Sequence, residues 1–331
     1  MKLSQVGENG LINKIKEKFS CNLPLEVIGI GDDCAVIPQN ENKSLLITTD
    51  LLIGGTHFLR DKITAHDLGY KSIAVNLSDV AAMGGTPKYA FLSVALPKDI
   101  SNDWLENFIA GINSILTEYQ VLLLGGDTSK SEKDIFINVV VIGEAEREKI
   151  KYRLGALPGD IICVTGNLGD SKAGLECVLQ DHCDNNLAKK LLHQHYRPQP
   201  QISEGLFLAQ YSETHAMLDV SDGINVDLVH MQEASNCGAK INLEKLPVSE
   251  NLLQFAKEFN VNAFEMAAIG GEDYCLLAAI EKDSFKEIAR EFQNKFKREL
   301  TPIGEITKEK ELKYFLNGES YKLSLKSFEH F

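Results

Sequence analysis

The chain has 331 residues, of which 44% are hydrophobic and 24% are charged, and its formal net charge is −13. This composition is typical of a globular protein that is long enough for two domains with separate cores. The acidic charge argues against a non-specific nucleic-acid-binding protein, which would need a basic face. It does not exclude an anionic substrate, because bound divalent cations reverse the local field.

The seven cysteines are scattered along the chain, and no pair has the C-x-x-C spacing of a zinc site. An odd number of scattered cysteines does not indicate a complete disulfide framework either, so reduced thiols and a cytoplasmic location are expected. Residues 1–5 lack the apolar core of a signal peptide, and no run of about 18 apolar residues predicts a membrane span. We expect a soluble protein with no membrane or nucleic-acid partner.

The first half of the chain predicts alternating strands and helices. Helices are expected over residues 9–19, over 64–83 with Thr64 as N-cap and Gly84-Gly85 at the end, and over 101–119 with Ser101 as N-cap. Strands are expected at 25–28, 34–37, 44–52, 89–96, 121–124 and 135–144. The strand 121–124 is expected to be buried, and 135–144 is apolar enough to be covered on both faces.

A charged segment at 146–151 and a turn at 155–160 indicate a domain boundary, which we place after residue 148. Beyond it, strands are expected at 161–165, 216–219 and 274–280, and helices after Gly169, at 201–211, from Gly223 to about Ala234 and at 283–292. Both parts predict an α/β or α+β architecture, with an N-terminal domain of residues 1–148 and a C-terminal domain of residues 149–331.

Three histidines, His182, His193 and His195, lie close together in the sequence. No acidic or cysteine partner stands at ligand spacing, so exposed loop and helix positions are preferred to a metal cluster.

Acidic side chains recur where apolar segments meet glycine-rich turns. They include Gly31-Asp32-Asp33 and Thr48-Thr49-Asp50, followed by Asp79, Asp127, Asp219 and Asp222. Each one alone fits an ordinary turn, because Gly and Asp favour turns by themselves. Together they favour a cluster of Mg²⁺ ions that holds a polyphosphate, with ligands from both halves. Asp79 follows small apolar residues of a helix, which makes it either a metal ligand or a paired acid.

The common nucleotide-binding and hydrolase signatures are absent. The sequence has no P-loop, no G-x-G-x-x-G fingerprint, no H-R-D motif and no G-x-S-x-G elbow, and the EF-hand calcium pattern is missing as well. An ATP-using enzyme built on this chain would therefore hold phosphates through metal ions and backbone N–H groups.

Several segments, in order along nearly the whole chain, resemble the thiamine-monophosphate kinase family. They are Gly29–Ala35, Thr48–Asp50 with His57-Phe58, Asn76–Gly84, Gly125–Thr128, Gly166–Ser171, Asp219–Gly223, Gly270–Tyr274 and Phe328–Phe331. The family belongs to the superfamily of aminoimidazole ribonucleotide synthetase and selenophosphate synthetase. The resemblance implies the two-domain fold of that superfamily: an N-terminal α/β domain that dimerises through its sheet, a C-terminal α/β domain, and ATP between them.

The resemblance also implies roles for individual residues. Those that would bind Mg²⁺ are Asp33, Thr48, Thr49, Asp50, Asp79, Asp127, Asp219 and Asp222. Those that would contact ATP are Gly126, Asp127, Arg153 and Ser221, and those that would hold thiamine monophosphate are His57, Glu272 and Phe328. Asp33 is the predicted ligand of the Gly-Asp-Asp turn, and Asp32 is expected to orient the loop.

Elementary chemistry is compatible with these roles. An aromatic face attracts a cationic ring, a carboxylate pairs with an amino group, and a guanidinium forks onto phosphate. Without the resemblance, Arg153 would be read as a solvated charge in a linker, and Phe328 equally well as an aromatic residue docked on the core.

The implied activity is Mg²⁺-dependent in-line transfer of the ATP γ-phosphoryl group to thiamine monophosphate, which gives thiamine diphosphate and ADP, the last step of thiamine diphosphate biosynthesis. The acceptor oxygen of a phosphate monoester is already anionic near neutral pH, so no catalytic side chain acting as a general base is expected. The number of metal ions and an assisting K⁺ stay open.

Three alternatives remain. A selenophosphate synthetase-like enzyme would need a reactive cysteine in a mobile glycine-rich segment, for which Cys21 is a poor candidate. A hydrogenase-maturation-like enzyme would need a C-terminal cysteine, whereas this chain ends in Phe331. The third is a non-catalytic protein that binds Mg²⁺ and nucleotide.

Overall fold

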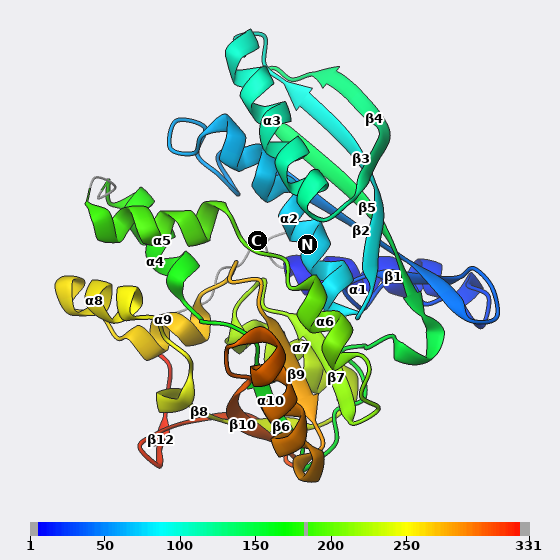
Figure 1. The fold of residues 1–331 in the computed structure, drawn as a ribbon, viewed down its shortest axis with the longest axis vertical. Coiled ribbons are helices and arrows are strands. Elements are labelled where there is room, and N and C mark those ends of the chain that lie inside the picture. The colour runs from blue at the N-terminus through cyan, green and yellow to red at the C-terminus, as the bar shows by residue number, and fades with distance from the viewer. Residues whose placement is uncertain (1–5, 182–184, 325–331) are drawn as a thin grey trace.

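The structure, a computed structural model, describes residues 6–181 and 185–324. Within them the strands form a five-stranded and a seven-stranded sheet, joined through helix α2 (Figure 1). The first part contains α1 (Gly7–Phe19), η2 (Ser20–Asn22), β1 (Ala35–Pro38), β2 (Lys43–Ile53), α2 (Ala65–Ala82), β3 (Thr86–Leu96), α3 (Asn102–Glu118), β4 (Leu122–Lys130), β5 (Phe136–Glu146) and η3 (Arg147–Lys149).

The second part contains β6 (Ile161–Val164), α4 (Asp170–Leu179), α5 (Asn186–Tyr196), α6 (Ile202–Leu208), β7 (Thr214–Asp219), α7 (Ile224–Ser235), β8 (Gly238–Asn242), η4 (Leu243–Lys245), α8 (Glu250–Phe259), α9 (Ala263–Ile269), β9 (Leu276–Ile280), α10 (Lys282–Phe296), β10 (Thr301–Thr307), β11 (Leu312–Leu316) and β12 (Glu319–Tyr321). None of the helices in residues 6–181 and 185–324 combines the length and apolar character needed to cross a membrane.

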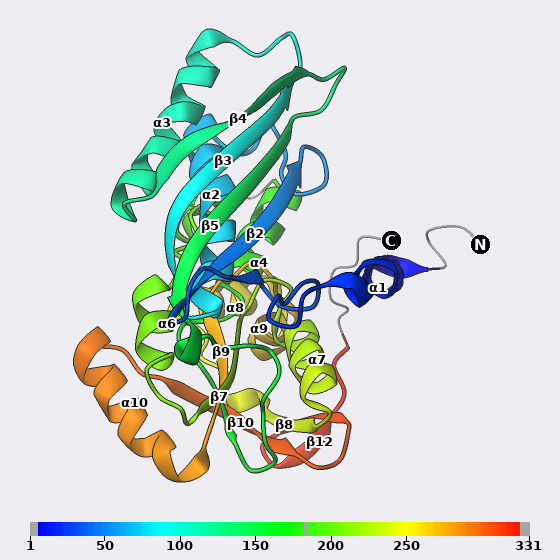
Figure 2. The ribbon, with the colours of Figure 1, turned by 90° about the vertical axis from the view of Figure 1, so that its right-hand side faces the viewer.

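The five-stranded sheet has the order β1-β2-β5-β3-β4, and α2 and α3 cover one of its faces (Figure 2). Both helices begin at the predicted N-caps: the Thr64 side chain accepts a hydrogen bond from the N–H of Asp67, and the Ser101 side chain accepts one from Trp104. The expectation that β5 is covered on both faces is wrong for the single chain. Its residues alternate between buried and partly exposed, because only the helix-facing side is packed.

The prediction of a short buried strand at 121–124 is also wrong. Strand β4 continues through Gly125-Gly126-Asp127 to Lys130, and Leu122, Leu123 and Leu124 are 60%, 46% and 55% exposed. The strand lies at the edge of the sheet and pairs only with β3. An apolar run of this kind does not reveal from sequence whether its strand is central or at an edge.

The seven-stranded sheet has the order β12-β11-β8-β10-β6-β9-β7 and is covered on both faces. Every residue of β9 is buried: Leu276, Ala278 and Ile280 pack in one core with α6 and α10, and Leu277 and Ala279 pack in the other with α4, α5, α7, α8 and α9. Helices α5, α8 and α9 and strand β8 were not predicted. Residues 25–28 make only an isolated bridge, between Ile28 and Val36, instead of the predicted strand.

Helix α2 belongs to both halves, because it contacts α3, β2 and β5 on one side and α6 and β7 on the other. The backbones touch at glycines. A Cβ added to Gly69 of α2 would clash with the carbonyl oxygen of Phe108 in α3, and one added to Gly205 of α6 would clash with that of Ala81 in α2. Side chains on α2 are therefore fixed relative to both sheets.

Candidate active site

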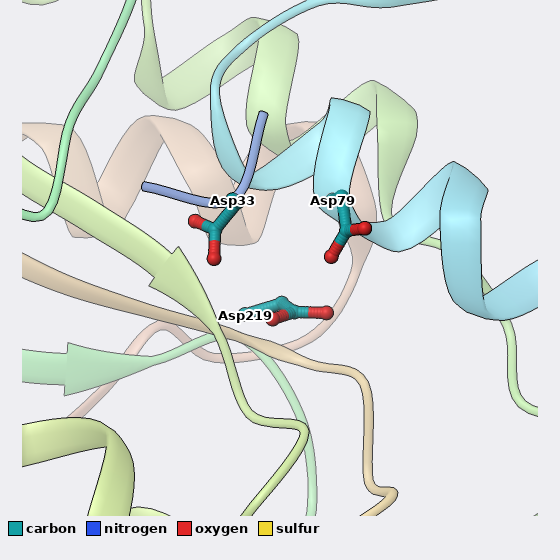
Figure 3. Close-up of side chains that lie close together, drawn as sticks. All are labelled: Asp33, Asp79 and Asp219. Carbon is teal, nitrogen blue, oxygen red and sulfur yellow. The ribbon is translucent and has the colours of Figure 1, made fainter. Parts of the chain in front are cut away.

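Three carboxylates from distant parts of the chain meet between the two sheets (Figure 3). Asp33 lies in the loop before β1, Asp79 lies near the end of α2, and Asp219 ends β7. One carboxylate oxygen of each lies within 4.8 Å of the other two, with Asp33 and Asp219 buried and Asp79 half-buried. The structure thus brings together acids that the sequence placed in both halves.

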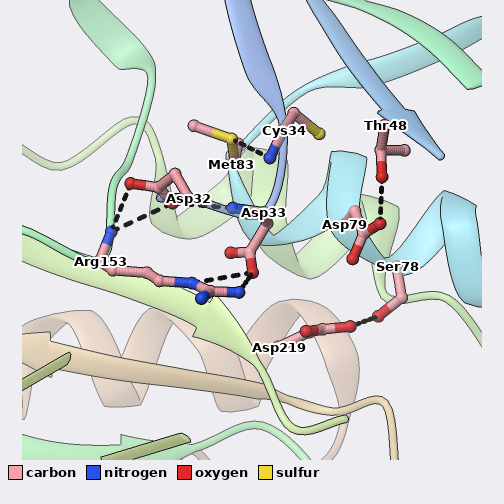
Figure 4. Close-up of polar contacts among 9 residues, drawn as sticks. All are labelled: Asp32, Asp33, Cys34, Thr48, Ser78, Asp79, Met83, Arg153 and Asp219. Atoms are coloured by element: carbon pink, nitrogen blue, oxygen red, sulfur yellow. Dashed lines mark hydrogen bonds and ion pairs between the residues drawn. The ribbon is translucent and has the colours of Figure 1, made fainter. Parts of the chain in front are cut away.

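Two hydroxyl groups hold this cluster (Figure 4). Thr48 Oγ1 donates to the Asp79 carboxylate, and Ser78 Oγ donates to Asp219 Oδ2 at 2.5 Å. Asp33 Oδ2 is buried and has no hydrogen-bond partner among the described residues. A buried carboxylate oxygen without a partner is costly, so this oxygen fits a role as a ligand of a cation.

Burial and mutual repulsion raise the pKa values of these carboxyl groups. The pKa of Asp219 is raised to about 8, first by burial and then by Asp33, and that of Asp79 is raised well above its usual range by burial, Asp50 and Asp219. The pKa of Asp50 is raised to about 6 by burial and then by Asp222 and Asp33. A set of oxygen ligands with this much uncompensated negative charge fits a hard divalent cation such as Mg²⁺.

The adjacent residues of the Gly-Asp-Asp turn have different partners (Figure 4). The Asp32 carboxylate accepts the N–H of Asp33 at 3.1 Å and the N–H of Arg153 at 3.1 Å. The Asp33 carboxylate lies in the cluster, and its Oδ1 accepts a hydrogen bond from Arg153 Nη2 at 2.5 Å. Asp32 therefore anchors the loop, and Asp33 presents its carboxylate to the site, while its binding of metal stays a prediction.

Thr49, Gly126 and Asp127 lie apart from the cluster. Asp50 on β2 pairs with Val139 on β5, which pairs with Leu92 on β3, which pairs with Gly126 on β4. Three strand spacings therefore separate Asp50 from Gly126, a distance of roughly 14 Å. Thr49 Oγ1 accepts a hydrogen bond from Asn138, which shares the outer face of the sheet with Asp127. The side chains of Thr49 and Asp127 therefore face away from α2.

A second group of predicted residues gathers around Glu272, in the loop before β9. Its Oε1 lies 2.9 Å from Lys71 Nζ, and its Oε2 lies 3.2 Å from His195 Nδ1. Burial raises the pKa of Glu272, but Lys71, His195 and the nearby His57 outweigh it and lower that pKa. The carbonyl oxygen of Ser221 accepts the N–H of Glu272 at 2.7 Å, which joins this loop to the end of β7.

The structure corrects the expectation that His195 is exposed. His195 lies on the buried side of α5, and only 4% of its surface is exposed. Phe328, the predicted aromatic contact of the substrate, lies outside the described residues, as does His182.

Three further residues at the site were missed by sequence reasoning. Lys71 and Ser78 are partners of predicted residues, and Asp227 is a buried acid of α7. Asp227 Oδ2 has no hydrogen-bond partner in the described part of the chain, and burial, Asp222 and Asp219 raise its pKa. The available signal was a charged or polar residue on an otherwise apolar helix face, which is the pattern that led to Asp79.

Comparisons with known proteins identify the family and the fold. The model of the AIR synthase related protein N-terminal domain matches residues 31–145, and that of the C-terminal domain matches residues 158–317. The chain is 37% identical to the thiamine-monophosphate kinase of Aquifex aeolicus, covering 100% of both chains, and 38% identical to that of Escherichia coli K12, covering 98% of both.

A solved structure named "AaThiL complexed with AMPPCP and TMP" superposes with a TM-score of 0.87 at 36% identity, covering 100% of this chain and 99% of that one. These matches confirm the two-domain AIR synthase-like fold that the sequence resemblance implies. The chain belongs to the thiamine-monophosphate kinase family.

Proposed function

We propose that this chain transfers the γ-phosphoryl group of ATP to thiamine monophosphate between its two sheets, in a reaction that depends on Mg²⁺. Family membership supports the activity, and a relative of known structure is described as complexed with AMPPCP and TMP. The observation that carries the metal dependence is the meeting of Asp33, Asp79 and Asp219, with one buried oxygen of Asp33 that has no hydrogen-bond partner in residues 6–181 and 185–324.

The residues of this chain would bind and orient two anionic substrates. The members of the predicted metal set that lie at the cluster would hold Mg²⁺, whose positive charge would offset the repulsion between ATP and the acceptor phosphate. The Arg153 guanidinium, which contacts Asp33, would bind ATP phosphates together with Ser221, whereas Gly126 and Asp127, also predicted to contact ATP, lie apart from this group in the single chain. His57, Glu272 and Phe328 would hold the acceptor, and its ionised phosphate needs no general base.

We also propose a homodimer that forms through the outer face of the five-stranded sheet. In the described chain this face carries Tyr89 and Leu51, which are 37% and 47% exposed, and it continues into the exposed edge strand β4. An exposed apolar edge strand is a template for pairing with another chain. A second copy would cover these side chains and bring the outward-facing Asp127 next to another protein surface. We further propose that the protein is located in the cytoplasm.

The direct test is an assay of the purified chain with ATP, Mg²⁺ and thiamine monophosphate. Thiamine diphosphate is expected as the product, with ADP formed in equal amount, and no product is expected with excess chelator. Parallel reactions with K⁺ and with Na⁺ measure any contribution of K⁺. ATP binding without formation of thiamine diphosphate would overturn the proposal in favour of a non-catalytic nucleotide-binding protein.

Two substitutions examine the metal site in the same assay. Asp50→Asn and Asp222→Asn should abolish turnover while circular dichroism shows a folded protein, because an amide is a poor Mg²⁺ ligand. Glu258→Gln, at an exposed position of α8, is the matched control and should leave turnover unchanged. Full activity in either aspartate variant would remove that residue from the metal site.

A further inference from the structure

Lys71 is a buried lysine that the proposed reaction does not use. It lies in α2, and its side chain is only 2% exposed. A buried ammonium group is costly unless it is paired. Its partner is Glu272, with Nζ and Oε1 2.9 Å apart, so a helix of the first half holds a carboxylate of the second half.

His195 contacts the other oxygen of the same carboxylate. Its Nδ1 lies 3.2 Å from Glu272 Oε2 and 3.0 Å from Ser171 Oγ, and its side chain is 5% exposed. Burial, followed by the charge of Lys71, lowers the pKa of His195 to about 3, so the imidazole is neutral. A carboxylate only accepts hydrogen bonds, so His195 can donate to Glu272 Oε2 in the tautomer that carries its proton on Nδ1.

The backbone of Glu272 is held in an unusual conformation. Its φ is 62°, in the left-handed region, which costs a non-glycine residue free energy unless the surroundings enforce it. The surroundings do so: the N–H of Glu272 donates to the Ser221 carbonyl at 2.7 Å, and the next carboxylate, of Asp273, accepts the N–H of Gly169 at 2.7 Å. Backbone and side chain of Glu272 are thus both fixed.

The three side chains differ in exposure. Lys71 and His195 are covered, whereas the Glu272 side chain is 28% exposed, and His57 is among the groups that lower the pKa of Glu272. We infer that Lys71 and His195 are positioning residues that hold the Glu272 carboxylate, ionised and fixed in rotation, toward the acceptor substrate. This inference rests on the proposed function, since it assumes that Glu272 binds the acceptor. An acceptor with a cationic ring and an amino group is the chemical class that such a carboxylate recognises.

Steady-state kinetics separate positioning from general structural support. Lys71→Met removes the charge and keeps the length of the side chain. It should raise KM for thiamine monophosphate at least about tenfold, as expected when one partner of a buried charge pair is removed, and leave KM for ATP unchanged. Lys189→Met, at an exposed position of α5, is the control and should change neither constant.

The double variant Lys71→Met/Glu272→Gln tests whether Lys71 acts through Glu272. If it does, the double variant has the same KM for thiamine monophosphate as Glu272→Gln alone, because the two losses are not additive. Additive losses, or equal changes in KM for both substrates, would overturn the inference.

Variants of His195 keep the test decisive if Lys71→Met fails to fold. His195→Leu removes the donor and should raise KM for the acceptor, whereas the side-chain amide of His195→Asn can replace Nδ1–H and should restore most of the loss. His193→Leu, exposed on the same helix, should leave KM unchanged. Equal effects of the two His195 variants would contradict the inference. Lack of turnover in the wild-type chain would instead contradict the proposed function. A normal KM for thiamine monophosphate in Glu272→Gln would overturn the inference and leave the proposed transfer reaction intact.

Discussion

Asp32 and Asp33 are adjacent in the chain, but their carboxylates contact different partners. Asp33 lies among Asp79 and Asp219, and Asp32 accepts the backbone N–H groups of Asp33 and Arg153. Replacing either carboxylate by an amide keeps its size and removes its charge. Such a pair of variants therefore separates a residue that faces the metal site from one that orients a loop.

We expect Asp33→Asn to reduce kcat far more than Asp32→Asn. Loss of a group that orients a metal ligand costs about tenfold to a hundredfold, so Asp32→Asn should lie at the lower end of that range. Asp33→Asn should exceed the range and should also raise the Mg²⁺ concentration needed for half-maximal activity. Titration of Mg²⁺ in the assay measures both. A larger Mg²⁺ shift in Asp32→Asn would exchange the two roles.

The raised pKa values predict how pH affects the metal-free protein. The pKa of Asp219 is raised to about 8 and that of Asp50 to about 6, whereas an unfolded Asp titrates near 3.9. Between about pH 4 and these values the folded chain keeps protons that the unfolded chain has lost, so its stability falls as pH rises. Thermal unfolding with chelator should give a lower Tm at about pH 8 than at about pH 5.

Two comparisons test whether these carboxyl groups cause the pH dependence of Tm. Mg²⁺ should raise Tm more at the higher pH, where the ligands are ionised, than at the lower pH. Asp219→Asn should weaken the pH dependence of Tm in chelator, because the amide does not titrate. If Asp219→Asn follows the wild-type pH profile, another group is responsible.

At the scale of elements, the packing of α2 on α3 depends on glycine. A Cβ on Gly69 would clash with the carbonyl oxygen of Phe108, and one on Gly111 would clash with that of His66. Alanine favours a helix over glycine by about 1 kcal/mol. Overpacking at a backbone contact costs about 1–3 kcal/mol, so the clash should outweigh this gain.

Gly69→Ala and Gly111→Ala should therefore both lower the free energy of unfolding, measured by denaturant titration. Gly10→Ala in α1, where an added Cβ meets only the Val6 side chain, is the control and should be neutral or stabilising. Stabilisation by either Gly69→Ala or Gly111→Ala would show that the helices can move apart without cost.

The sequence predicted best those elements whose signal is local. The sequence shows the N-caps Thr64 and Ser101 and the apolar spacing of α2 and α3, because each of these signals lies within a few neighbouring residues. Helix α5 was missed although Leu187, Ala188 and Leu191 recur at helical spacing, because most of its other residues are polar or charged. The place of β4 at the edge of its sheet depends on pairing with distant strands, and nothing in Leu122-Leu123-Leu124 encodes it.

The candidate site divides in the same way. The acids were found because they follow apolar segments and glycines, a pattern that can be recognised in the sequence without knowledge of the fold. The contacts of Lys71 and His195 with Glu272 were not found, because nothing in the sequence pairs residue 71 or residue 195 with residue 272. Only the three-dimensional packing of α2 against the second half brings these side chains together.

For the whole molecule, the exposed edge of β4 predicts association. Leu122→Glu places a charge on an edge residue that is 60% exposed and pairs with Tyr89. If the proposed homodimer uses this face, light scattering coupled to size exclusion should show a dimer for the wild-type chain and a monomer for the variant. Leu253→Glu, at a 47% exposed position of α8, should remain dimeric. A monomeric wild-type chain would contradict the proposed assembly.

The packing of α2 against the second half determines whether the two halves stay together when the chain is cut between them. Its residues pack in a core that also contains Phe207 of α6 and Met217 of β7, and its backbone touches α6 at Gly205. The connection between the two sheets, residues 147–160, is therefore not what keeps them together. A proteolytic nick there would leave two fragments that stay bound, whereas a fragment that ends before α6 would leave much of α2 uncovered and prone to aggregate.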